Sequence, residues 1–234
     1  MNKRVLLVEN HPQTNIGLVG QALAEARVAT EMIRPWQGDA VPTTTGNFDG
    51  LVVFGGAQDA LDDRNHPYLP DLARLMALYG AADLPVLGIC LGSQILARAH
   101  GGENLLGQTP EFGWCGIELC DDGRRDPVLS SAGDHFSIFQ WHSDTFTLPK
   151  SAVRLARSAR VENQCFRIGR ASYGMQFHFE AGDAVVAEWV AHESGEIERF
   201  APGWLKHYPA ERERHLKTAE ETGLAMARAW IALL

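Results

Sequence analysis

Apolar runs and amphipathic stretches alternate through the first hundred residues of the chain. Short β-type runs at Val5–Glu9, Val28–Ile33 and Gly50–Phe54 are separated by segments whose apolar residues recur at helical spacing. Those segments predict helices over residues 15–27 and from residue 67 to about residue 82. Because strands that alternate with helices form right-handed βαβ units, this half of the chain predicts a parallel sheet covered by helices.

The pattern changes after the glycine pair at 101–102. Shorter β-rich pieces follow, with Gly, Asp and Pro between them, and they predict the antiparallel edge of a mixed sheet. These pieces are Gly116–Leu119, Phe136–Trp141, Val153–Ala159, Gln164–Ile168 and Tyr173–Phe177. We therefore expect one α/β domain over residues 1–234, with a core of about 1–190 and a helical C-terminal extension of about 191–234.

The extension ends in a helical pattern over residues 209–234 that carries one apolar stripe. The stripe consists of Leu216, Ala219, Met226, Trp230 and Leu233. Such a stripe is more often packed into the core of its own chain than exposed as a partner surface. A homo-oligomer contact through this helix is the alternative.

Composition and charge narrow the class of protein. Hydrophobic residues make up 45% of the 234 positions, which is typical of a packed globular protein, and the formal net charge of −8 disfavours nucleic acid as a partner. No apolar run approaches the roughly 18 residues that a membrane helix needs. The first apolar run is short and ends in Glu9, so it does not resemble a secretion signal. The sequence therefore predicts a cytoplasmic protein without a membrane partner.

The segment Gly88–Gln94, which reads G-I-C-L-G-S-Q, places a cysteine where a buried strand turns sharply into a helix. Such a turn presents the Cys90 side chain at the tip of a sheet and directs the N–H groups of the helix start toward whatever the side chain attacks. A thiol at this position is closer to the reactive thiolate than a thiol in a core. The other cysteines, Cys115, Cys120 and Cys165, have no patterned histidine nearby and are interpreted as free structural thiols.

A cysteine nucleophile needs a base and donors for the oxyanion. His178 follows apolar positions that predict a strand end, and Glu180 lies two residues further on, where its carboxylate can orient the imidazole. Cys90, His178 and Glu180 thus form a candidate triad. The backbone N–H groups of Leu91, directly after the cysteine, and of Gly56, in a glycine turn, are the candidate oxyanion donors.

The motifs around Cys90 and His178 resemble those of the class I (triad) glutamine amidotransferase family. The two segments that carry the resemblance are Gly88–Gln94 and Gln176–Glu180, and it extends over roughly residues 3 to 190. Three further segments agree in the same order along the chain: Phe54–Gly56, Glu111–Trp114 and Gln140–Asp144. The resemblance implies a three-layer α/β/α, flavodoxin-like fold. Within the family the chain is most similar to the free-standing branch related to the amidotransferase domain of GMP synthase.

The resemblance also implies a reaction. Cys90 attacks the side-chain amide of glutamine, His178 delivers a proton to the leaving ammonia, and water then hydrolyses the γ-glutamyl thioester to glutamate. The amino-acid end of the substrate is held by Gln94 and by the main chain near Trp141 and His142. Supporting its own loop is the alternative role of His142. The family commonly has proline where this chain has Ala57 and Phe179, two departures that remove no reacting group.

Several alternatives concern what the ammonia is for. The chain has neither a Ser-Gly-Gly-x-Asp-Ser loop nor a G-x-x-x-x-G-K loop, so an ATP-dependent amination needs a separate synthase subunit. One alternative is a γ-glutamyl peptidase that cleaves γ-glutamyl conjugates by the same thioester route. A second is a non-catalytic scaffold that retains the fold. The sequence has no H-E-x-x-H motif and no clustered Cys/His spacing, so we expect no metal and no cofactor.

Overall fold

The computed structural model describes residues 3–234 and contains eleven strands. Nine of them form one mixed sheet in the order β2-β1-β3-β4-β11-β10-β9-β6-β7, and β5 pairs with β8 in a small second sheet. The strands are β1 (Arg4–Val8), β2 (Ala29–Ile33), β3 (Gly50–Val53), β4 (Val86–Ile89), β5 (Asn104–Leu105), β6 (Glu111–Leu119), β7 (His135–His142), β8 (Thr145–Phe146), β9 (Ala152–Ser158), β10 (Cys165–Ile168) and β11 (Ser172–Met175).

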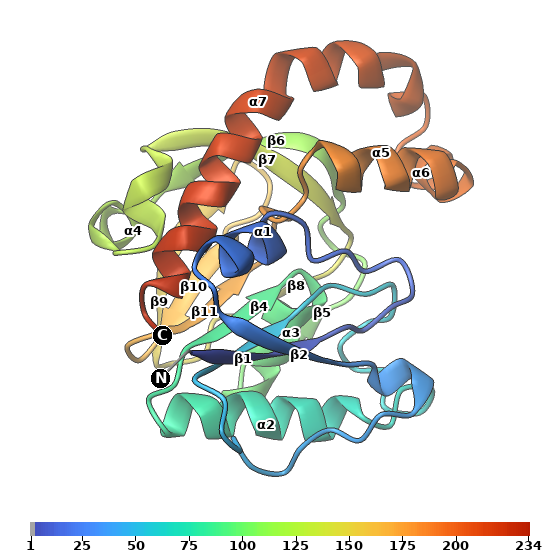
Figure 1. The fold of residues 1–234 in the computed structure, drawn as a ribbon. Coiled ribbons are helices and arrows are strands. Elements are labelled where there is room, and N and C mark those ends of the chain that lie inside the picture. The colour runs from blue at the N-terminus through green and yellow to red at the C-terminus, as the bar shows by residue number, and fades with distance from the viewer. Residues whose placement is uncertain (1–2) are drawn as a thin grey trace.

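Helices cover both faces of the sheet (Figure 1). They are α1 (Gly17–Glu25), α2 (Leu69–Ala81), α3 (Leu91–Ala99), α4 (Asp121–Arg125), α5 (Asp183–His192), α6 (Ser194–Phe200) and α7 (Trp204–Ile231), with 3-10 turns at Pro35–Gln37 and Leu129–Ala132. In Figure 1, α1 and α7 lie on one side of the parallel strands and α2 on the other. This arrangement confirms the predicted three-layer α/β/α fold.

The parallel half of the sheet consists of β2, β1, β3, β4 and β11. Alternate residues of its strands enter two different core clusters, as in β1, where Leu7 packs with the α1 and α7 side and Leu6 with the α2 and α3 side. Both side chains are buried because a parallel sheet is covered on both faces. The predicted strands and helices of this half are present, with ends that differ by a few residues.

The antiparallel half consists of β10, β9, β6 and β7, and it confirms the mixed character of the sheet. The prediction for β6 was too short, because the strand begins at Glu111 rather than Gly116. Its first residues pair with the end of β7, where Glu111 stands opposite His142. This pairing, and not the local sequence, extends the strand through Gly113.

The C-terminal helix α7 begins at Trp204, before the predicted start at Pro209, which lies inside the helix. Gly203 has φ +82° and so provides the left-handed residue from which the helix begins. The apolar stripe packs into the core, with Met226 and Trp230 fully buried. In the part of the chain from residue 3 onward, no helix combines the length and apolar character that crossing a membrane requires.

Candidate active site

The turn between β4 and α3 holds Cys90 in a conformation that few side chains adopt, with φ +50° and ψ −109°. Cys90 N–H donates to the carbonyl of Met175 at 2.8 Å, which ties the turn to β11. A Cβ at Gly88 would lie 2.4 Å from the carbonyl oxygen of Gly92, and one at Gly92 would lie 2.1 Å from that of Val53. Both glycines are therefore required for this close turn, which holds the thiol at the carboxyl edge of the sheet.

His178 comes from the segment after β11, the strand that pairs in parallel with β4. Its N–H donates to the Phe139 carbonyl at 2.8 Å, and its Nδ1 lies 2.7 Å from Glu180 Oε1. This contact orients the imidazole and leaves Nε2 free for a reacting group. A Cβ placed on Gly55 would lie 3.2 Å from His178 Cε1 and 3.5 Å from Cys90 Cβ. The imidazole ring of His178 and the side chain of Cys90 thus both lie next to Gly55.

The charges of this pair determine its proton state. Burial lowers the pKa of His178, but the Glu180 carboxylate and the Cys90 sulfur oppose burial and raise that pKa well above its ordinary value. At neutral pH the imidazole is therefore protonated and faces the sulfur. Glu180 is itself buried, and its Oε2 has no hydrogen-bond partner among residues 3–234.

A cavity of about 390 Å³ opens in front of the cysteine. All eight residues that the sequence singled out line this cavity: Gly56, Cys90, Leu91, Gln94, Trp141, His142, His178 and Glu180. Leu91 is the first residue of α3, so its N–H belongs to the first helical turn and lacks a partner within the helix. The structure therefore brings together a thiol, a charged imidazole, a carboxylate and free backbone donors.

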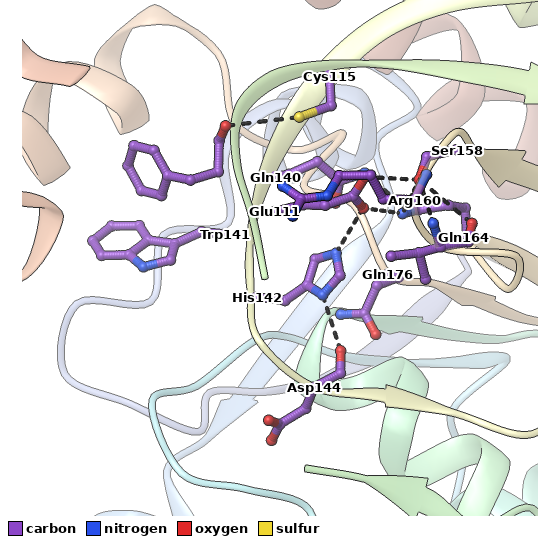
Figure 2. A network of polar contacts seen from close by, with 12 residues as sticks. Glu111, Cys115, Gln140, Trp141, His142, Asp144, Ser158, Arg160, Gln164 and Gln176 are labelled. Atoms are coloured by element: carbon purple, nitrogen blue, oxygen red, sulfur yellow. Dashed lines mark hydrogen bonds and ion pairs between the residues drawn. The ribbon is translucent and has the colours of Figure 1, made fainter. Parts of the chain in front are cut away.

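Two of these residues also make contacts inside the protein. The side chain of Gln94 donates to Gln176 Oε1 at 3.3 Å, and Gln176 Nε2 lies 3.8 Å from Cys90 Sγ. The imidazole of His142 is buried and hydrogen-bonded to Glu111 and to the carbonyl of Asp144, as Figure 2 shows. Its side chain therefore supports the loop in which it lies.

Sequence reasoning missed several further residues at this site, and four of them lie close to the proposed reacting groups or in the segment of α5 and α6. Gln176 lies inside a quoted motif but received no role, although its amide reaches the sulfur. Trp189, Glu193 and Phe200 line the cavity from α5, α6 and the residue between them. No local signal identifies these three, because their place at the cavity depends on how α5 and α6 pack against the sheet.

Comparisons with known proteins identify the family of this chain. Residues 7–185 match the family described as Glutamine amidotransferase class-I. The chain is 33% identical over 167 residues to the glutamine amidotransferase-like protein YfeJ of Salmonella typhimurium, covering 70% of each chain. It is 29% identical over 197 residues to a subunit of the glutamine-hydrolyzing GMP synthase of Haloquadratum walsbyi, covering 80% of this chain and 97% of that one.

Solved structures show the same similarity over nearly the whole chain. A glutamine amidotransferase from Methylobacillus flagellatus superposes with a TM-score of 0.88 at 26% identity, covering 100% of this chain and 96% of that one. One from Thermotoga maritima gives a TM-score of 0.84 at 27% identity, with 99% and 97% covered. The chain belongs to the class I glutamine amidotransferase family.

Proposed function

We propose that the protein hydrolyses the side-chain amide of glutamine through a γ-glutamyl thioester on Cys90. The observation that carries this proposal is the meeting of Cys90 and the charged His178–Glu180 pair at one cavity. An amide is a poor electrophile, so its cleavage requires a strong nucleophile, a proton donor for the leaving nitrogen and stabilisation of the oxyanion. The cavity offers a group for each of these tasks.

In the first half of the reaction, the Cys90 thiolate bonds to the side-chain carbonyl carbon of glutamine. The backbone N–H groups of Gly56 and Leu91 stabilise the resulting oxyanion. The His178 imidazolium gives its Nε2 proton to the amide nitrogen, the carbon–nitrogen bond breaks, and ammonia leaves. Cys90 then carries the γ-glutamyl group as a thioester, and His178 is neutral.

In the second half, a water molecule attacks the thioester carbon and passes a proton to His178. The carbon–sulfur bond breaks, its electron pair returns to Sγ, and glutamate is released. The thiolate–imidazolium pair is thereby restored. Glu180 stabilises the imidazolium in both halves without taking the proton itself. Gln94 and the main chain at Trp141 and His142 hold the amino-acid end of the substrate.

We further propose that the ammonia serves a separate synthase subunit in the cytoplasm. Support comes from the match over 97% of the H. walsbyi protein, which is one subunit of a GMP synthase. The glutamine-hydrolyzing GMP synthase of Christiangramia forsetii is matched over only 39% of its length, at 26% identity. This contrast in coverage supports the proposal that a partner consumes the ammonia.

The experiment is to incubate the purified chain with glutamine and, separately, with γ-glutamyl dipeptides, and to follow glutamate release. We expect release from glutamine, and Cys90→Ser is expected to abolish it while the circular dichroism spectrum stays unchanged. Faster release from the dipeptides would support the γ-glutamyl peptidase alternative. The absence of release from both, together with no labelling of Cys90 by a glutamine-like electrophile, would support the non-catalytic scaffold.

A further inference from the structure

We propose that Glu111 is a positioning residue for this site, acting through His142 on the segment that lines the substrate cavity. The proposal rests on the proposed glutamine hydrolysis. Glu111 lies at the start of β6, directly opposite His142 at the end of β7. Its exposed fraction is 4%, so its carboxylate lies in the protein interior and needs polar partners there.

Three side chains supply those partners (Figure 2). Glu111 Oε2 lies 3.2 Å from His142 Nε2 and accepts from Gln164 Nε2 at 2.5 Å, while Oε1 accepts from Ser158 Oγ at 2.7 Å. Burial raises the pKa of Glu111, but these contacts, that to His142 first among them, outweigh burial and lower the pKa below its usual value. Glu111 is therefore ionised.

Two contacts hold the ring of His142 in place. Its Nδ1 lies 2.9 Å from the carbonyl oxygen of Asp144, which only accepts hydrogen bonds, so Nδ1 carries a hydrogen. Its Nε2 faces the ionised Glu111 carboxylate, which also only accepts. Both ring nitrogens thus have a partner, and the His142 ring is held between β6 and the turn after β7.

The contact between Glu111 and His142 lies next to the segment that borders Cys90. Trp141 and His142 line the cavity, and the carbonyl of Trp141 lies 3.7 Å from Cys90 Sγ. The Nδ1 bond to Asp144 fixes the turn that follows, and the Nε2 bond to Glu111 fixes the ring. Loss of the Glu111 charge therefore releases the 141–144 main chain from its place beside the sulfur, although Glu111 touches neither substrate nor Cys90.

The test compares Glu111→Gln with the wild type in glutamine hydrolysis. Glutamine has the shape of glutamate without its charge, so the variant removes the carboxylate charge beside His142 and leaves the volume unchanged. We expect KM for glutamine to rise about tenfold or more while kcat changes by less than about threefold, since positioning of the bound amino acid is lost. His142→Asn keeps a donor near the Asp144 carbonyl but removes the contact with Glu111. The double variant is expected to be no worse than the single ones, because the two residues act as one unit.

The matched control is Asp126→Asn. Asp126 is an equally buried carboxylate, bonded to Arg167 at 2.9 Å and to Tyr173, but it does not line the cavity. This control is expected to lower the melting temperature and to leave KM unchanged. A Glu111→Gln variant that loses stability in the same way and keeps the wild-type KM would overturn the proposal.

A second measurement applies if the variant folds poorly or if the wild type does not hydrolyse glutamine. The concentration of a glutamine-like electrophile that half-saturates Cys90 labelling reports binding without turnover. An increase of about tenfold for Glu111→Gln supports the proposal, and an unchanged value overturns it. Failure of the proposed function has a different signature, because then the wild type itself releases no glutamate.

Discussion

The cysteines of this chain differ in the charge that surrounds each thiol. Burial raises the pKa of Cys115 to about 11 and that of Cys165 well above its ordinary value, so both remain protonated and inert. Cys90 faces the imidazole of His178, which Glu180 keeps charged. The reactivity that we propose for Cys90 therefore depends on a neighbouring cation and not on exposure, since Cys90 is itself buried.

Replacing the carboxylate of Glu180 tests this dependence. We expect Glu180→Gln to lower kcat/KM on the order of 10²-fold or more, because only the Cys90 sulfur then opposes burial, the pKa of His178 falls, and the ring becomes a poorer proton donor at neutral pH. Steady-state hydrolysis of glutamine at pH 7 checks this. Glu188→Gln, at an exposed carboxylate of α5, is the control and is expected to match the wild type.

The His178–Glu180 pair is expected to make the stability of the fold depend on pH. The folded protein raises the pKa of His178 above its unfolded value of 6.5, so the charged ring stabilises the fold fully below pH 6.5. This contribution is lost as the pH rises through the folded pKa. The difference in unfolding free energy between wild type and Glu180→Gln is therefore expected to shrink with increasing pH above 6.5. Urea titrations at several pH values would contradict this if the difference stayed constant.

The helices α5 and α6 form one wall of the cavity. The family match ends at residue 185 and therefore includes only the first residues of α5. Trp189 of α5 packs edge-on against the ring of His178 at 5.2 Å and against Trp141 at 5.5 Å between centroids. One side chain of α5 therefore contacts both the proposed base and the segment proposed to hold the substrate. From this position α5 is expected to influence which γ-glutamyl compound fits the cavity.

Shortening Trp189 tests that role. Trp189→Leu removes two edge-to-face contacts, each of which contributes about 0.5–1.5 kcal/mol beyond the area it buries. We expect kcat/KM for glutamine to fall by about tenfold and the rate on γ-glutamyl dipeptides to rise relative to glutamine, because the wall recedes. The ratio of the two rates is the measurement. Trp36→Leu, outside this cavity, is the control, and an unchanged ratio in Trp189→Leu would contradict the expectation.

The elements differ in how well the sequence predicts them. Strands β1 and β3 could be placed within a residue, because a buried parallel strand is a short apolar run between turn residues. The start of β6 could not, since pairing with β7 and not local propensity extends it to Glu111. Helix α7 likewise continues through Pro209 because its packing outweighs the missing backbone donor.

The candidate site shows the same division. Cys90, His178 and Glu180 could be found from the sequence because each lies in a short motif at a strand end. The contact of His142 with Glu111 and the wall formed by α5 join segments that lie far apart in the chain. Such contacts leave no local pattern, so only the folded structure identifies them.

Over the whole molecule, α7 runs back across the sheet and seals the face that carries α1 (Figure 1). Trp230 has no exposed surface, and its Nε1 donates to the carbonyl of Val86 at 3.3 Å. Val86 begins β4, the strand whose other end leads to Cys90. The C-terminal helix thus stabilises the strand that carries the nucleophile from the end opposite the reaction.

Truncating this side chain separates stability from chemistry. Trp230→Ala is expected to lower the free energy of unfolding by about 3–5 kcal/mol, because it leaves a large cavity in the core. Urea denaturation measures the loss, and Leu61→Ala, at an exposed position, is the control with little change. At low temperature the folded variant is expected to keep its kcat, since Val86 lies roughly 13 Å along the strand from Cys90. A selective loss of kcat without loss of stability would contradict this.

The pairing of β4 with β11 has a consequence for how such proteins acquire new substrates. Cys90 and the segment before His178 are spaced by neighbouring strands of one sheet, whereas the contacts proposed for the substrate come from the end of β7 and from α5 and α6. Recombination between relatives can therefore exchange the outer segments while the reacting pair stays intact. Because Glu111 on β6 contacts His142 on β7, these two strands have to be inherited together. A chimaera that takes only one of them is expected to bind the amino-acid end of the substrate more weakly.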